Sequence, residues 1–214
     1  MVTATPLFDY IKDPEEIYRQ SFKTVRREAE LDGFSELAAN VVVRLIHACG
    51  MTDIATDIRI SEGAVEAGQA ALEAGKPIFV DAEMVGAGII RKRLHNNNPV
   101  ICTLNNPAVL AMAKEMETTR SAAAVDLWEE QMEGAVVVFG NAPTALFRLL
   151  EIIAESGPRP ALILGFPVGF IGAAESKEAL LTHAGTVPYI TLQGRRGGSA
   201  IAAAAVNALA GDPE

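Results

Sequence analysis

A histidine and an arginine at helical spacing, inside an otherwise apolar stretch, are the first candidates for chemistry. His47 lies in the run from Arg44 to Gly50, and Arg44 precedes it by three residues, so both side chains project from one helical face. Histidine changes its protonation state near neutral pH, and arginine binds carboxylates through paired hydrogen bonds. One interpretation is a proton donor held beside an anion-binding arginine. The other is a structural histidine near a helix end.

Further polar groups follow the short apolar runs of the chain, where buried strands are expected to end. In a parallel sheet the carboxyl ends of the strands share one edge, and ligands bind there. Helices that start at this edge add backbone N–H groups, which attract anions. We therefore expect a site for a large, oxygen-rich anion at this edge, and its candidate residues are Arg120, Ser121, Asn141, Arg195 and Arg196.

The elements that must position these residues alternate along the chain. Asp13, Pro14 and Glu16 are the residue types that start a helix, here expected to run to about Glu30, and a second helix is expected from near Ser35 to Gly50. Five apolar runs are typical of strands buried on both faces: 78–81, 100–104, 135–139, 161–164 and 189–192. Between them lie helical stretches at 64–74, 84–93, 107–116, 121–132, 142–156, 174–183 and 199–210. This pattern predicts an α/β fold with three layers, in which a mostly parallel sheet of about five strands carries helices on both faces.

Length and hydropathy agree with a single folded unit. The 214 residues contain no repeat or low-complexity linker, so we expect one α/β domain over 1–214 with a helical N-terminal segment at about 13–50. Mean hydropathy is +0.22, yet the uncharged stretch from Leu94 to Ala113 holds five asparagines and two prolines, which a membrane span would not tolerate. No secretory signal is found, and Cys49 and Cys102 lie in apolar surroundings. A cytoplasmic protein is expected.

Several other classes of function are disfavoured. A net charge of −9, spread over both halves, offers no basic face to a nucleic acid. Gly86 and Gly88 begin a dinucleotide fingerprint, but Arg91 stands where its third glycine belongs. The histidines, His47, His95 and His183, stand apart, so no zinc site is expected. No G-x-S-x-G elbow of a hydrolase occurs.

Six longer sequence motifs are more specific for a protein family than any single residue. They are R-L-I-H-A-C-G at 44–50, D-A-E-M-V at 81–85, T-R-S-A-A at 119–123, G-N-A-P-T-A-L at 140–146, G-F-P-V-G-F at 165–170 and G-R-R-G-G-S at 194–199. In this order, and over about residues 13–209, the chain resembles the precorrin-8X methylmutases, the precorrin isomerases of cobalamin biosynthesis.

The resemblance implies a reaction and a set of roles. The family converts precorrin-8X to hydrogenobyrinate by moving a methyl group from C-11 to C-12 of the macrocycle, without redox cofactor, nucleotide or protein-bound metal. His47 matches the family's catalytic histidine. Ser21 and Arg44 match substrate-contacting residues, and the T-R-S motif places Arg120 near the substrate. The resemblance also implies a homodimer with its active sites close to the subunit interface.

The leading hypothesis is thus an isomerase in which His47 donates or accepts a proton. A corrinoid carrier without chemistry is the alternative of a different class, and it predicts binding without turnover. A third possibility is the cobalt-precorrin-8 methylmutase of the oxygen-independent route. An NAD-dependent oxidoreductase rests on fold analogy only.

Overall fold

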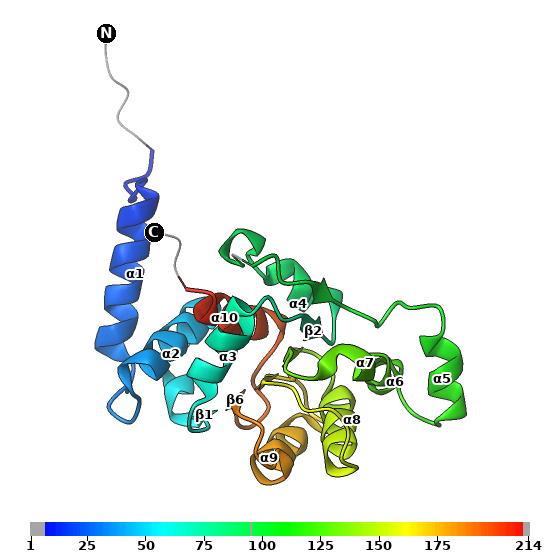
Figure 1. Ribbon diagram of the computed structural model, residues 1–214. Helices are drawn as coiled ribbons and strands as arrows, with labels where there is room; N and C mark the ends of the chain where they lie inside the picture. Colours follow the sequence, from blue (N-terminus) through cyan, green and yellow to red (C-terminus); the bar gives the residue numbers. More distant parts are fainter. Residues whose placement is uncertain (1–6, 95, 212–214) are drawn as a thin grey trace.

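Six short strands form one mixed sheet at the centre of the computed structural model, which describes residues 7–94 and 96–211 (Figure 1). The strand order is β1-β6-β5-β4-β2-β3, and every neighbouring pair is parallel except β1 and β6. The α/β fold and the mostly parallel sheet are therefore confirmed. The strands are β1 (Ile58–Ile60), β2 (Ile78–Val80), β3 (Val100–Ile101), β4 (Val136–Phe139), β5 (Leu162–Gly165) and β6 (Tyr189–Leu192).

The sixth strand, β1, was not predicted from the sequence. It has three residues with an exposed Arg59 at its centre, so it lacks the continuous apolar run that marked the other five. It pairs antiparallel with β6, with Ile58 opposite Leu192. Because β1 runs against the other strands, the segment before it lies at the carboxyl edge of the parallel sheet. That segment is the short helix η1 (Thr52–Asp57).

Alternate residues of the central strands face two separate cores. Val136 and Val138 of β4 belong to one core, and Val137 and Phe139 belong to the other. The first face is covered by α2 (Glu36–Cys49), α3 (Ala64–Glu73), α4 (Glu83–Gly88) and α10 (Ser199–Leu209). The second face is covered by α6 (Arg120–Asp126), α7 (Glu129–Met132), α8 (Pro143–Ala154) and α9 (Ala173–His183). The three predicted layers are present.

Two predicted helices are divided in the structure. The stretch 84–93 becomes α4 followed by the short helix η2 (Arg91–Arg93), and 121–132 becomes α6 and α7, while α5 (Val109–Glu115) lies inside its predicted range. The second glycine of α4, Gly88, serves packing. A Cβ on Gly88 would lie 2.7 Å from the Ala203 Cβ of α10, so the two helices approach more closely than a side chain would allow.

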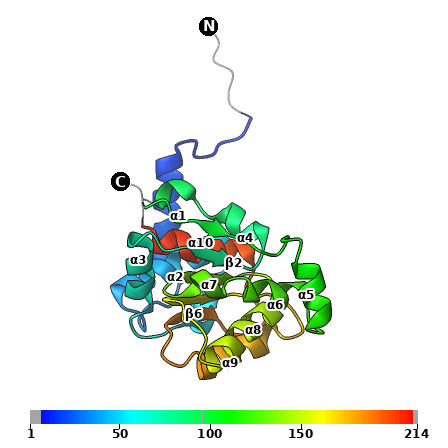
Figure 2. The same ribbon diagram turned by 45° about the vertical axis from the view of Figure 1, so that its right-hand side comes forward.

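The N-terminal helices begin where the cap residues predicted. The Asp13 carboxylate accepts the N–H of Glu15 at 3.0 Å and starts α1 (Pro14–Glu28), which ends two residues before the expected Glu30. Ser35 caps the start of α2, and Gly50, with φ 71°, caps its end. Within α1 only Val25 is buried, and the helix packs on α2 at the margin of the molecule (Figures 1 and 2).

Two further features concern membrane-spanning helices and the cysteine thiols. Within 7–94 and 96–211, no helix combines the length and apolar character needed to cross a bilayer. Cys49 and Cys102 are both partly buried free thiols. Residues 1–6, 95 and 212–214 of the predicted domain lie outside the described part of the chain.

Candidate functional site

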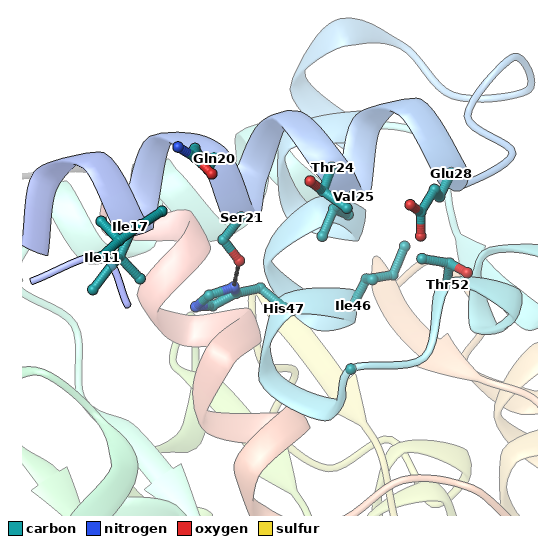
Figure 3. A pocket seen from close by; sticks show the side chains of 11 residues that line it. Ile11, Ile17, Gln20, Ser21, Thr24, Val25, Glu28, Ile46, His47 and Thr52 are labelled. Carbon is teal, nitrogen blue, oxygen red and sulfur yellow. Dashed lines mark hydrogen bonds between the residues drawn. The ribbon is translucent and has the colours of Figure 1, made fainter. Parts of the chain in front are cut away.

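Ser21 of α1 and His47 of α2 meet across the contact between the two helices. The Ser21 Oγ lies 3.0 Å from His47 Nδ1 (Figure 3). Arg26 of α1 also donates a hydrogen bond to Asn40 of α2, so the two helices run in opposite directions. Because Ser21 engages Nδ1, Nε2 is the ring nitrogen left for a ligand. This geometry matches the orientation of a proton-transferring histidine by a neighbouring hydroxyl.

A cavity of about 380 Å³ opens beside this pair. α1 supplies one wall with Gln20, Ser21, Thr24 and Glu28, while the end of α2 and Thr52 of η1 close the other side (Figure 3). Thr24, Glu28 and Thr52 were not among the residues predicted from the sequence. Thr24 follows Ser21 by three residues and Glu28 follows Thr24 by four, so they lie on the same face of the helix. A search along that face from Ser21 could have predicted both.

Aromatic rings surround the histidine and the neighbouring arginine. Tyr18 and Phe22 stack with their ring centroids 4.3 Å apart, and the Phe22 ring lies 5.0 Å from the His47 ring. The Arg44 guanidinium carbon lies 5.3 Å from the Phe22 centroid and 6.0 Å from that of Tyr18. The structure therefore brings three predicted residues, Ser21, Arg44 and His47, to one place.

A second group lies at the switch point of the sheet, where the chain leaves β2 for β3 on one side and later returns as β4 on the other. This is the position where open α/β sheets bind ligands. Here the carboxylate of the buried Asp81 accepts the N–H groups of Gly140 at 2.9 Å, Asn141 at 2.9 Å and Ala142 at 2.7 Å. Burial raises the pKa of Asp81, and these N–H groups act in the opposite direction. The start of α8 is thus occupied by a carboxylate of the protein.

Arg120 and Ser121 open α6 beside this switch point. The Thr119 and Thr144 hydroxyl oxygens lie 2.8 Å apart and join the starts of α6 and α8. Arg120 donates to the Leu104 carbonyl oxygen at 3.1 Å and to Asn105 Oδ1 at 3.2 Å. Arg120 and Ser121 therefore lie in the first turn of α6, whereas Asn141 lies on the loop between β4 and α8.

The two adjacent arginines after β6 have different surroundings. Arg195 is exposed, and its guanidinium carbon lies 5.5 Å from the Phe170 ring centroid. Arg196 donates to Asp53 Oδ2 at 2.6 Å and to Asp57 Oδ2 at 2.7 Å. Its guanidinium is therefore held by two carboxylates of η1, a pairing that the sequence did not indicate.

The predicted residues form three groups rather than one pocket. The cavity of His47 is lined by none of Arg44, Arg120, Asn141 and Arg195, and Arg44 lines a separate cavity of about 250 Å³. The groups are nevertheless related through η1, which lies at the carboxyl edge of the sheet and carries both Thr52 of the cavity wall and the two aspartates that hold Arg196.

Metal ligands do not gather in the described part of the chain. No group of three or more histidine, cysteine, aspartate or glutamate side chains is placed to hold an ion there. His183 ends α9 and contacts Thr182 and the Ala179 carbonyl oxygen, and His95 lies outside the described residues.

A histidine and an arginine that share the Phe22 ring as a neighbour, with further arginines toward the carboxyl edge of the sheet, define an α/β protein suited to an anionic ligand and to proton transfer. The family model of precorrin-8X methylmutase matches residues 16–211. The chain belongs to the precorrin-8X methylmutase family, a family of intramolecular transferases within the isomerases of cobalamin biosynthesis. The resemblance found in the sequence motifs is confirmed.

Individual relatives agree over nearly the whole chain. The precorrin-8X methylmutase of Pseudomonas aeruginosa is 58% identical over 208 residues, which cover 97% of this chain and 100% of the relative. The cobalt-precorrin-8 methylmutase of Salmonella typhimurium is 40% identical, over 94% of this chain and 96% of the relative. The crystal structure of the precorrin-8X methyl mutase from Thermus thermophilus superposes with a TM-score of 0.83 at 43% identity and covers 92% of this chain and 94% of that one.

Proposed function

We propose that this protein converts precorrin-8X to hydrogenobyrinate by moving a methyl group from C-11 to C-12 of the macrocycle. Family membership supports the reaction class, and 58% identity to a precorrin-8X methylmutase supports the metal-free substrate over the cobalt-bearing one. The observation that carries the mechanism is the contact between Ser21 Oγ and His47 Nδ1 at the cavity.

In the proposed mechanism, His47 exchanges a proton with the conjugated ring through Nε2. The reaction is an isomerisation, so the proton that His47 gives is recovered as the ring settles into its new tautomer, and no atom is gained or lost. Protonation makes the carbon that receives the methyl group more electron-poor and favours the migration. General acid catalysis of this kind contributes roughly 10² to 10⁴ in rate. Ser21 keeps the imidazole oriented while this happens.

The remaining predicted residues would hold the periphery of the substrate. Arg44, Arg120 and Arg195 would bind its carboxylate arms, because a guanidinium offers two parallel donors to each carboxylate. Ser21, Ser121 and Asn141 would add hydrogen bonds. Orientation of a bound ring in this way lowers the entropic part of the barrier. Arg196 was also predicted to bind substrate, but its guanidinium is paired with Asp53 and Asp57.

The decisive experiment incubates the purified protein with precorrin-8X and follows the absorption of the ring. Wild-type protein should form hydrogenobyrinate, and His47→Ala should lower the rate by at least about a hundredfold. His183→Ala is the matched control, because His183 lies at the end of α9 outside the His47 cavity, and it should retain full activity. Full activity of His47→Ala would refute the mechanism.

The two alternatives give different results in the same assay. A corrinoid carrier would bind precorrin-8X tightly and leave its spectrum unchanged over time. A cobalt-precorrin-8 methylmutase would turn over the cobalt-bearing substrate with a higher kcat/KM than the metal-free one.

Three further properties complete the proposal. We propose that residues 1–214 act as a single domain, that two copies form a homodimer with the active sites near the interface, and that the protein works in the cytoplasm. The free thiols of Cys49 and Cys102 favour a reducing compartment. Light scattering on the eluting protein measures the mass, and a monomeric mass would contradict the dimer.

A further inference from the structure

Lys177 of α9 is a buried cation that the proposed reaction does not use. Its side chain is 0% exposed, and its Nζ donates a hydrogen bond to the Arg196 carbonyl oxygen at 2.6 Å. Within the described residues no carboxylate forms an ion pair with it. Burial lowers the pKa of Lys177 to about 8. A buried ammonium without a counter-ion is unfavourable for folding. We therefore expect the hydrogen bond from Lys177 to Arg196 to have a specific structural role.

Both the main chain and the side chain of Arg196, whose carbonyl oxygen accepts this bond, are held in place. Lys177 fixes its main chain, and Asp53 and Asp57 of η1 fix its guanidinium at 2.6 and 2.7 Å. Asp53 is 70% exposed in its side chain, so the ion pair contributes little to overall stability. The value of this arrangement is geometric: it fastens one loop to two separate elements.

The fastened loop, residues 193–199, is rich in glycine. It contains three glycines, and Gly194 and Gly198 adopt φ values of 80° and 115°. Glycine loses more conformational freedom on ordering than other residues do. Backbone bonds also hold the loop, from Gly198 N–H to the Phe166 carbonyl at 2.8 Å and from Gly169 N–H to the Arg195 carbonyl at 3.2 Å.

The loop is connected to the cavity of His47 through η1. It presents the exposed guanidinium of Arg195, and it ends at Ser199, where α10 begins. Through Asp53 it contacts η1 next to Thr52, which lines the cavity of His47 (Figure 3). Movement of the loop would therefore change the position of Arg195 relative to that cavity.

We infer that Lys177 and Arg196 are positioning residues that fasten loop 193–199 to α9 and to η1, and so hold Arg195 at a set place at the carboxyl edge of the sheet. The inference rests on the proposed function for its catalytic consequence. It replaces direct substrate binding as the role of Arg196. In this arrangement the guanidinium of Arg196 pairs with Asp53 and Asp57 of the protein, and the guanidinium of Arg195 binds the substrate.

Steady-state kinetics separate the two roles of Arg196. If Arg196 positions the loop, Asp53→Asn/Asp57→Asn should raise KM for precorrin-8X about as much as Arg196→Ala does, by about tenfold or more, with kcat nearly unchanged. If Arg196 instead bound substrate, the double variant would free its guanidinium, and KM would stay the same or fall. That result would overturn the inference.

Arg148→Ala is the matched control for these variants. Arg148 also spans two carboxylates, Asp126 at 2.7 Å and Glu151 at 3.2 Å, but it joins α6 to α8 away from loop 193–199. Its loss should affect stability without raising KM. An equal rise of KM in Arg148→Ala would show that the effect is a general loss of packing, and it would refute the positioning role.

Hydrogen exchange tests the same inference without any assay of activity. Lys177→Met should accelerate exchange of the amides in residues 193–199 by at least about tenfold, while the amides of β4 remain protected. Arg196→Ala should accelerate the same amides, and it takes the place of Lys177→Met if that variant does not fold. Unchanged exchange in the loop would overturn the inference. A wild-type protein that fails to isomerise precorrin-8X would refute the proposed function and leave this measurement valid.

Discussion

Ser21 and His47 lie 26 residues apart in the chain, yet Ser21 Oγ is 3.0 Å from His47 Nδ1. The contact depends on the antiparallel packing of α1 against α2, to which Arg26 and Asn40 add a second hydrogen bond. One nitrogen of the imidazole is thereby committed to the protein, and the other is left for the ligand. The orientation of the His47 imidazole is thus a property of a helix pair at the margin of the fold.

Replacement of Ser21 tests this orientation. Ser21→Ala removes the partner of His47 Nδ1, so kcat should fall by about tenfold, which corresponds to the loss of one hydrogen bond. KM should change less than kcat, because the bond orients the proton donor. Ser21→Thr retains the hydroxyl and should restore most of kcat. Equal losses in both variants would point to crowding instead of a missing hydrogen bond.

Replacement of Asp81 should lower the stability of the fold. Asp81→Ala leaves the N–H groups of Gly140, Asn141 and Ala142 without their acceptor, and two of these residues, Gly140 and Ala142, are buried. Each unsatisfied buried donor costs about 1 to 3 kcal/mol, so we expect the free energy of unfolding in urea to fall by at least about 2 kcal/mol. The exposed Glu73 provides the control. Glu73→Ala should change the free energy by no more than about 0.5 kcal/mol.

Lys177 predicts a rise of stability in alkaline solution. Its pKa is about 8 in the folded protein, against 10.5 ordinarily, so between these values the unfolded chain binds more protons than the folded one. The free energy of unfolding should therefore rise from pH 8 to about 10.5, by at most about 3 kcal/mol, relative to Lys177→Met. Urea titrations of both proteins across this range measure the difference. A difference that does not vary with pH would contradict the lowered pKa.

Gly197 tests how closely the loops after β5 and β6 approach each other. A Cβ at this position would clash with the Phe166 carbonyl oxygen and lie 2.8 Å from that of Pro167, and backbone atoms cannot move aside easily. Gly197→Ala should therefore destabilise the protein by about 1 to 3 kcal/mol and raise KM. Gly33→Ala is the control, because a Cβ there would have no atom within 4 Å, and this variant should be neutral or slightly stabilising.

The sequence predicted those elements whose residues carry a local signal. Asp13 and Ser35 cap α1 and α2 through contacts with residues two or three positions away, so short-range rules suffice for them. The continuous apolar runs marked five strands. β1 was not predicted, because three residues around Arg59 form a strand only through pairing with β6.

The candidate site could be predicted only in part for a similar reason. Residue type and family motifs identified His47, Arg44 and Ser21, but their contact arises from the packing of two helices. An arginine at a strand end has the same sequence signature whether it faces solvent, as Arg195 does, or pairs with Asp53 and Asp57, as Arg196 does. The pairing joins positions more than a hundred residues apart, and no local pattern records it.

Because α1 is sparsely packed, we expect the protein to lose its activity and its folded sheet in two separate steps. Only Val25 of this helix is buried, whereas the sheet lies between two extensive cores. Detachment of α1 therefore requires less free energy than unfolding of the sheet, and it would carry Ser21 and a wall of the cavity away from His47. On gradual heating, activity should disappear while the circular dichroism of the sheet and its helices is still largely intact.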